Sequence, residues 1–347
     1  MLERLERFFS NRRNVIIVAS LVGALLVIAI GLVVALLIGN NTPKSSSSSS
    51  DEGNSLSSGN VSDLTGSTSS YRNLKGLTLR INQIETCNPS VVSAYVAVSS
   101  EAGVVNKNFS KKDVEVYLDN KRLNTFDFNS VDTTKTPLTN VLLIDHSGSM
   151  RGDPMENAKS AATNYIQNLK SGDQVGVVQF DDRIEVLQNV STDKATAAGA
   201  VSQIQPRGDT ALFDGLDQAI SLTPDCGRKA VTVLTDGDDT ASKNNTTESV
   251  INAANKANLP IFSVGVNGEG FNPSAIKQIS ESTGGQYLEA NTPTEISQLY
   301  SNINGQLTGQ FVANLKLSLK KNGSSHTLKI VSTIEGSPTS SERSFIY

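Results

Sequence analysis

The sequence predicts an α/β fold: a doubly wound, mostly parallel sheet inserted in a β-sandwich of N- and C-terminal flanking strands, with an N-terminal transmembrane helix. Three observations predict it. A long apolar run lies near the N-terminus, two segments of alternating apolar and polar residues flank the folded part, and apolar strands alternate with amphipathic helices between them. At 347 residues the chain is long enough for two folded units.

The apolar run covers residues 15–38 and contains no charged residue. As a helix it would be about 36 Å long, enough to cross a hydrocarbon core of about 30 Å. A cleavable signal peptide is the alternative, but its apolar core would normally be about 7–15 residues long, and no A-x-A-like site follows Ile38. We therefore expect a signal-anchor helix.

Arginines dominate residues 1–14, whereas no basic cluster follows the apolar run. The positive-inside rule then predicts a cytoplasmic tail at 1–14 and a single-pass cell-membrane protein with extracytoplasmic C-terminal domains. Residues 39–72 are rich in Ser, Gly, Asn and Thr, so we expect a disordered linker with a reach on the order of 30 Å. Residues 1–14 carry a net charge of +2, and the remainder, with 26 basic and 32 acidic residues, carries −6, so nucleic acid is a poor candidate partner for the remainder.

Alternating patterns occupy residues 73–137 and 308–347, at both ends of the folded part. They include Leu77–Ile81, Val92–Val98, Val114–Leu118, Phe311–Leu319, Thr327–Ile334 and Arg343–Tyr347. Neither flank alone supplies enough strands for a stable sandwich. We therefore expect the two flanks to build one β-sandwich together, with residues 138–307 inserted between them.

The middle segment, 138–307, changes to strands that alternate with helices. We expect strands at Val141–Asp145, Gln174–Phe180, Ile184–Leu187, Ala230–Thr235 and Ile261–Val266. We expect helices at Met155–Leu169, Thr192–Ile204, Leu212–Leu222, Ser249–Ala257, Pro273–Ser282 and Thr294–Leu307. This order predicts a mostly parallel sheet covered on both faces, and such sheets bind ligands at the carboxyl ends of their strands.

Oxygen-bearing side chains lie on three loops: two of the loops follow strands, and the third precedes a helix. Asp145 ends a strand, and Ser147 and Ser149 follow on one tight loop. Thr210 precedes a helix, and Asp236 follows another apolar strand. Carboxylates and hydroxyls are the ligands that hard cations such as Mg²⁺ accept, so the three loops predict a common metal site.

In this setting the D-x-S-x-S, G-x-T-A-L and T-D-G motifs resemble the metal-ion-dependent adhesion site (MIDAS) of von Willebrand factor type A domains, from about residue 140 to 306. The resemblance assigns five residues to the metal: Asp145, Ser147, Ser149, Thr210 and Asp236. It implies Mg²⁺, with Ca²⁺ or Mn²⁺ as substitutes, and a protein ligand that supplies an Asp or Glu side chain. It also implies a binding module and not an enzyme. The extra acids Asp238 and Asp239 after T-D-G are a departure that could weaken the attraction of the ion for a carboxylate.

Other motifs favour no competing chemistry. Asp145, His146 and Ser147 are adjacent in sequence, so they cannot form a catalytic relay, and the G-x-S-x-G turn of many hydrolases is absent. With His326 as the only other histidine, a histidine-based zinc centre is disfavoured. Two Arg-Gly-Asp tripeptides, at 151–153 and 207–209, adjoin the metal loops, where Gly and Asp favour turns and helix starts.

Cys87 and Cys226 are the only cysteines. The predicted compartment permits a disulfide, and Cys226 should lie at the sheet edge that faces the sandwich, so a bridge and two separate thiols are both consistent with the sequence. The leading functional interpretation is metal-dependent adhesion or recognition at the cell surface. The alternative is a structural or regulatory subunit of a cell-envelope complex that uses the same domain for assembly.

Overall fold

The computed structural model describes residues 77–100, 103, 109–267, 271–317, 319, 321–334 and 337–347. All of them belong to one unit of the chain, Gly66–Tyr347. The predicted tail, membrane span and linker, residues 1–72, lie outside the described residues. Within the described part, helices of membrane-spanning length and hydropathy are absent.

A six-stranded sheet occupies the middle of the chain. Its spatial order is β11 (Tyr287–Ala290), β10 (Ile261–Val266), β9 (Arg228–Thr235), β6 (Leu138–Asp145), β7 (Gln174–Phe180) and β8 (Ile184–Ser191). Neighbours run parallel except β8, which is antiparallel to β7. Every residue of β6, β9 and β10 is buried, as a sheet with both faces covered requires. The prediction of a mostly parallel sheet is confirmed.

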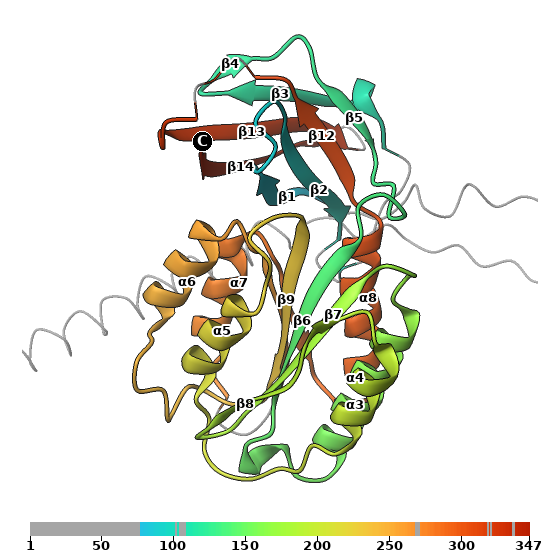
Figure 1. The fold of residues 1–347 in the computed structure, drawn as a ribbon, viewed down its shortest axis with the longest axis vertical. Coiled ribbons are helices and arrows are strands. Elements are labelled where there is room, and N and C mark those ends of the chain that lie inside the picture. Colours follow the sequence, from blue (N-terminus) through green and yellow to red (C-terminus); the bar gives the residue numbers. More distant parts are fainter. Residues whose placement is uncertain are drawn as a thin grey trace, which may run out of the picture. The chain divides into compact units, whose positions relative to one another are not determined.

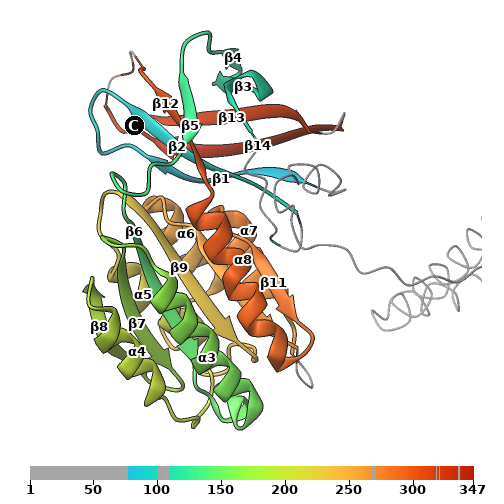
Figure 2. The same cartoon turned by 90° about the vertical axis from the view of Figure 1, so that its right-hand side faces the viewer.

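Two groups of helices cover the sheet, one on each face (Figure 1). The first group is α3 (Asp153–Asn168), α4 (Lys194–Ser202) and α8 (Ile296–Thr308). The second is α5 (Leu212–Ser221), α6 (Thr247–Lys256) and α7 (Ser274–Thr283). Figure 2 looks onto α3 and α8, which pack side by side.

Local sequence explains where these helices start and stop. In α6, Thr246 and Ser249 form a capping box, each side chain accepting the other's backbone N–H. Helix α7 ends at Gly284, which has a φ of 87° that a side chain would disfavour. Predicted helix boundaries therefore lie within a few residues of the observed ones. Strand β11 was not predicted, because its four residues form too short a pattern.

Two further sheets are built from both ends of the chain. One has the order β1 (Thr78–Glu85), β2 (Val92–Ser99), β12 (Phe311–Leu315) and β5 (Asp127–Ser130). The other has the order β14 (Ser337–Ile346), β13 (Ser325–Ile334), β3 (Val114–Leu118) and β4 (Lys121–Arg122). Their inward side chains, including Ile84, Val116, Phe311 and Ile330, share one apolar core. Three short 3₁₀ turns complete the elements: η1 (Lys111–Asp113), η2 (Gly148–Met150) and η3 (Pro293–Glu295).

The flanking sheets and the central sheet are joined by a disulfide between Cys87 and Cys226, which lie 139 residues apart in sequence. Hydrogen bonds surround it: Gln83 Nε2 donates to the Gly227 carbonyl over 2.8 Å, and the Gly227 N–H donates to Glu85 Oε2 over 2.6 Å. The sequence was consistent with either a disulfide or two separate thiols, and the structure contains the disulfide.

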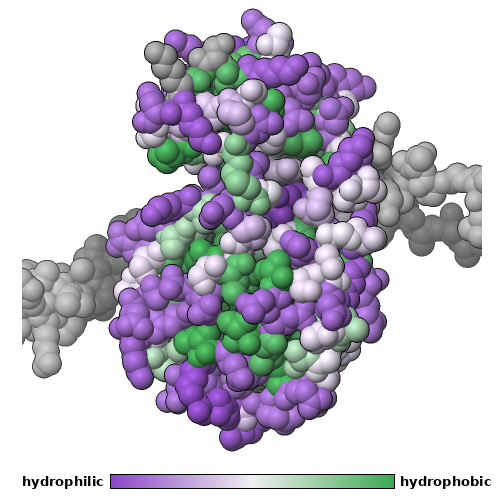
Figure 3. Space-filling view, viewed as in Figure 1, coloured by the Kyte–Doolittle hydropathy of each residue, from purple (hydrophilic) through white to green (hydrophobic). Residues whose placement is uncertain are grey.

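Strand β8 is the least buried strand of the central sheet. Its apolar residues Ile184, Val186 and Val190 are only partly buried, although they pack against the core on the α5 side of the sheet. Figure 3 shows hydrophobic residues over the middle of the α/β part, surrounded by hydrophilic ones. An edge strand pairs on one side only, which accounts for this exposure.

Candidate metal centre

The first loop of the site starts at Asp145, the last residue of β6, whose side chain is fully buried. The Ser147 N–H donates to Asp145 Oδ1 over 2.8 Å, and the Thr235 hydroxyl donates to Asp145 Oδ2 over 2.6 Å. Both carboxylate oxygens are therefore held in place. Thr235 ends the neighbouring parallel strand β9, so the strand register itself brings the two residues together.

The two serines of this loop face the third loop. The tight turn η2 places Ser147 Oγ 3.0 Å from Ser149 Oγ. Ser149 Oγ in turn donates to Asp236 Oδ1 over 2.8 Å, across 87 positions of sequence. Three of the predicted ligands thus form one continuous chain of oxygen atoms.

Thr210 completes the set from the second loop. A Cβ built on Gly237 would lie 3.2 Å from Thr210 Oγ1, so this hydroxyl lies directly against the residue after Asp236. The backbone fixes it there: the Thr240 N–H donates to the Thr210 carbonyl over 2.8 Å, and the Thr210 N–H donates to Thr240 Oγ1 over 3.1 Å. The side chains of all five predicted residues therefore gather at the carboxyl ends of β6 and β9.

The electrostatics of these residues favour a cation. Burial raises the pKa of Asp145 to about 7, against the opposing effect of the hydrogen bonds from Thr235 and Ser147. Burial also raises the pKa of Asp236, and the hydrogen bond from Ser149 opposes it. Among the described residues no ion pair joins either carboxylate to a basic side chain. One buried carboxylate (Asp145) and one partly buried carboxylate (Asp236) lie beside three hydroxyls and have no basic partner among the described residues, which matches the oxygen ligands and charge that Mg²⁺ requires.

The extra acids of the third loop make structural contacts. Asp238 Oδ1 accepts the Asn272 N–H over 2.9 Å. Asp239 Oδ1 accepts the Phe213 N–H over 3.2 Å, near the start of α5. Backbone N–H groups of a neighbouring loop and of helix α5 therefore hold these two carboxylates in place.

Two other clusters of polar side chains do not form a reactive centre. The ring of His146 contacts the Gln205 carbonyl through Nδ1, at 2.9 Å, and not the hydroxyl of Ser147. Glu85 lies beside Cys87 and Cys226 at metal-like spacing. Both sulfurs belong to the disulfide, however, and a disulfide sulfur is not the thiolate that metals bind.

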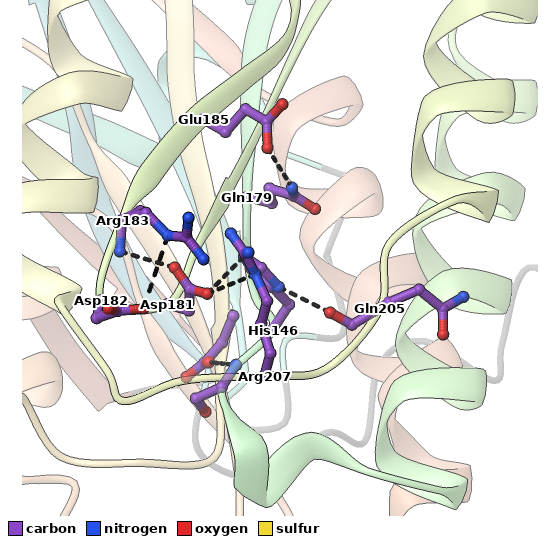
Figure 4. Close-up of polar contacts among 10 residues, drawn as sticks. His146, Gln179, Asp181, Asp182, Arg183, Glu185, Gln205 and Arg207 are labelled. Carbon is purple, nitrogen blue, oxygen red and sulfur yellow. Dashed lines mark hydrogen bonds and ion pairs between the residues drawn. The ribbon is translucent and has the colours of Figure 1, made fainter.

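Sequence reasoning missed a buried polar network under the second loop. Figure 4 shows His146 and Arg207 beside the carboxylate of Asp181, the residue that follows β7. Arg207 Nε lies 2.8 Å from Asp181 Oδ2, which is a close ion pair without the alignment of a hydrogen bond. The second Arg-Gly-Asp tripeptide, 207–209, therefore has a structural use. In the first, Gly152 has a φ of 83° and Asp153 starts α3.

Part of this chain is similar in sequence to known proteins. Residues 141–302 match the von Willebrand factor type A domain profile. An uncharacterized protein of Synechocystis sp. is 27% identical over 59% of this chain and 50% of its own length. Inter-alpha-trypsin inhibitor heavy chain H2 of Mus musculus is 25% identical over 49% of this chain and 20% of its own length. The chain thus spans half or less of these curated relatives.

Among solved structures, mussel byssus proximal thread matrix protein 1 with a zinc-occupied MIDAS motif is 22% identical with a TM-score of 0.47, covering 55% of this chain and 49% of that one. The family profile and the observed central sheet with its two helical layers agree. Residues 141–302 of this chain are similar to a von Willebrand factor type A domain.

Proposed function

We propose that this chain is a membrane-anchored, extracytoplasmic adhesion or recognition protein that binds an acidic side chain of a protein ligand through one divalent metal ion. Mg²⁺ is the expected ion, and its ligands are the five side chains described above: Asp145, Ser147, Ser149, Thr210 and Asp236. The observation that carries the proposal is the continuous run of oxygen atoms from Ser147 through Ser149 to Asp236.

The ligand set explains why an acidic partner is favoured. Three of the five proposed ligands are neutral hydroxyls, so the two carboxylates balance the charge of a bound Mg²⁺ without making the site negative. Magnesium prefers six oxygen ligands, and five side chains leave room for one more. A carboxylate of the partner fits that position because it is the hard oxygen ligand that Mg²⁺ prefers. The exposed rim of the loops, where Arg151, Asp153 and Asp209 are all solvent-accessible, gives the partner access.

The membrane anchor is proposed from the sequence alone. Residues 15–38 would span the bilayer, and residues 39–72 would tether the folded part outside the cell. A tether of this composition has a reach on the order of 30 Å, which would let the metal face meet ligands on another surface.

Metal binding is the first test. We would titrate the full-length protein, in detergent, with Mg²⁺ by calorimetry, and compare it with Asp145→Ala and Thr210→Ala. We expect Asp145→Ala to abolish binding and Thr210→Ala to weaken it by at least the roughly 10–100-fold that changes around a metal site cost. Asp127→Ala is the control, since this exposed carboxylate lies on β5 of the flanking sheets, away from the metal loops. Equal affinity in all four proteins would contradict the proposed site.

Ligand binding is the second test. The immobilised protein would be exposed to surface extracts in Mg²⁺ and then eluted with EDTA. Proteins that elute with EDTA from the wild type and are absent with Thr210→Ala support adhesion through the metal. A stoichiometric partner that survives EDTA and the substitution would instead favour the envelope-complex subunit.

A further inference from the structure

We propose that Asp181 is a positioning residue of the metal centre: from the end of β7 it holds the loop that carries Thr210 against the loop that carries Asp145. This inference rests on the proposed metal-binding function and assigns a role to a residue outside the five ligands. Asp181 is fully buried, although it directly follows a strand at the solvent-facing edge of the site.

The side chain of Asp181 forms an ion pair with the loop that precedes Thr210. Its Oδ2 lies 2.8 Å from Nε of Arg207, three residues before Thr210, and its Oδ1 accepts the Arg183 N–H over 2.7 Å. The Arg207 side chain is 44% exposed, whereas the carboxylate is not exposed at all. The charge of a buried carboxylate is costly unless it is paired, so the pairing strongly favours this position of Arg207.

The backbone of Asp181 accepts a hydrogen bond from the same loop, just after Thr210. Its carbonyl accepts the N–H of Ala211, the residue after Thr210, over 2.7 Å. One residue thus restrains Thr210 from both directions, through an ion pair on one side and a backbone hydrogen bond on the other. Such partners around a metal site orient its ligands and tune its affinity.

The first loop is tied into the same arrangement. The His146 N–H donates to the Phe180 carbonyl over 3.0 Å, and the His146 carbonyl accepts the Arg207 N–H over 2.7 Å. The Gly148 N–H donates to the Gly208 carbonyl over 3.0 Å. In Figure 4 the His146 side chain lies beside Asp181, with Nε2 3.8 Å from its Oδ2. Asp181 therefore lies where the loop that carries Asp145 contacts the loop that carries Thr210.

Gly208 shows how close this approach is. It has a φ of 70°, and a Cβ there would lie 2.6 Å from Asp182 Oδ1 and 3.0 Å from Asp181 Oδ2. A side chain would push the loop away from the buried carboxylate. Glycine is favoured here both by the positive φ and by the closeness of the Asp181 and Asp182 carboxylates.

A general contribution to folding is the competing explanation, and the chain offers a matched control for it. Asp173 is also buried and lies next to the same strand, but at the opposite end of β7 from the metal loops. Its Oδ1 accepts the Leu138 N–H over 2.8 Å, and its Oδ2 accepts the Lys170 N–H over 2.9 Å. Asp173→Asn should lower stability without reaching the metal.

The experiment compares Mg²⁺ affinity and melting temperature for the wild type, Asp181→Asn and Asp173→Asn in the full-length protein. We expect Asp181→Asn to weaken Mg²⁺ binding by about 10–100-fold. Asp173→Asn should stay within about threefold of the wild type, since distant sites are largely independent. Both variants should melt at a lower temperature than the wild type. The difference in Mg²⁺ affinity between them, and not the melting temperature, therefore tests whether Asp181 positions the metal loops.

A double-mutant cycle adds a second readout. If Asp181 acts through Arg207, then Arg207→Gln should weaken Mg²⁺ binding as well, and the double variant should lose less affinity than the two single losses combined. Arg207→Gln also carries the test by itself should Asp181→Asn fail to fold, because the Arg207 side chain is half-exposed.

Two negative results are distinguishable. A wild-type protein that binds no divalent cation would overturn the proposed function and this inference with it. A wild type that binds Mg²⁺, with Asp181→Asn and Arg207→Gln both within threefold of it, would overturn this inference alone and leave the five-residue site intact.

Discussion

Replacing both cysteines by serine, in the variant Cys87→Ser/Cys226→Ser, should lower the free energy of unfolding by several kcal/mol. The bridge joins residues 139 positions apart, and both cysteines are exposed, so serines at these positions cost little packing. The loss should arise mainly in the unfolded state. The chain-entropy estimate for a loop of this length is about 5 kcal/mol, and native disulfides typically contribute about 2–5 kcal/mol.

The native contacts around the bridge should survive the change. The hydrogen bonds that link Gln83 and Glu85 to Gly227 do not involve the sulfurs, and Gln83 Oε1 also accepts the Lys229 N–H over 3.1 Å. The variant should therefore fold normally. Its unfolded state, free of the cross-link, should be more expanded and should give a larger dependence of stability on urea.

The assay is urea unfolding of the full-length protein followed by far-UV circular dichroism, because the chain contains no tryptophan. The midpoint should fall in the variant, and reductant should bring the wild type to the same midpoint while leaving the variant unchanged. A wild type and a variant that unfold at the same urea concentration, with reductant affecting neither, would refute this account of the bridge.

Three further outcomes follow from the packing and the charges. Gly285→Ala should destabilise the protein by about 3 kcal/mol or more, since its Cβ would collide with the backbone carbonyl of Ile261; a thermal melt indistinguishable from wild type would contradict this. Gly199→Ala, in α4 with open space around the new Cβ, should instead raise stability by about 0.5–1 kcal/mol in the same melt. Burial acts to raise the pKa of Asp214, but hydrogen bonds from the loop at residues 243–245 outweigh it and lower that pKa. The contribution of Asp214 is therefore complete above its unfolded pKa of about 3.9 and is lost as the pH falls through the lower folded value, so Asp214→Asn should flatten acid unfolding measured below about pH 4.

Local patterns in the sequence were sufficient to predict most strands and helices of the central α/β part. Continuous apolar runs such as Ile261–Val266 predicted buried parallel strands, and helix periodicity placed α3 to α8 to within a few residues. The four-residue strand β11 was missed because its pairing with β10, and not its own composition, makes it a strand. The strand predicted at Ile184–Leu187 extends to Ser191 for the same reason, since β7 continues beside it.

The sequence by itself determined which oxygen atoms are candidates for the metal, because each of the five side chains ends or follows a strand, or precedes a helix, whose local pattern is visible. Only the tertiary structure decided how they are held. Thr235 meets Asp145, Asp181 meets Arg207, and Cys87 meets Cys226 across 90, 26 and 139 positions respectively. These contacts depend on strand register, loop closure and burial, which arise only when distant segments pack together and which no local pattern of residues encodes.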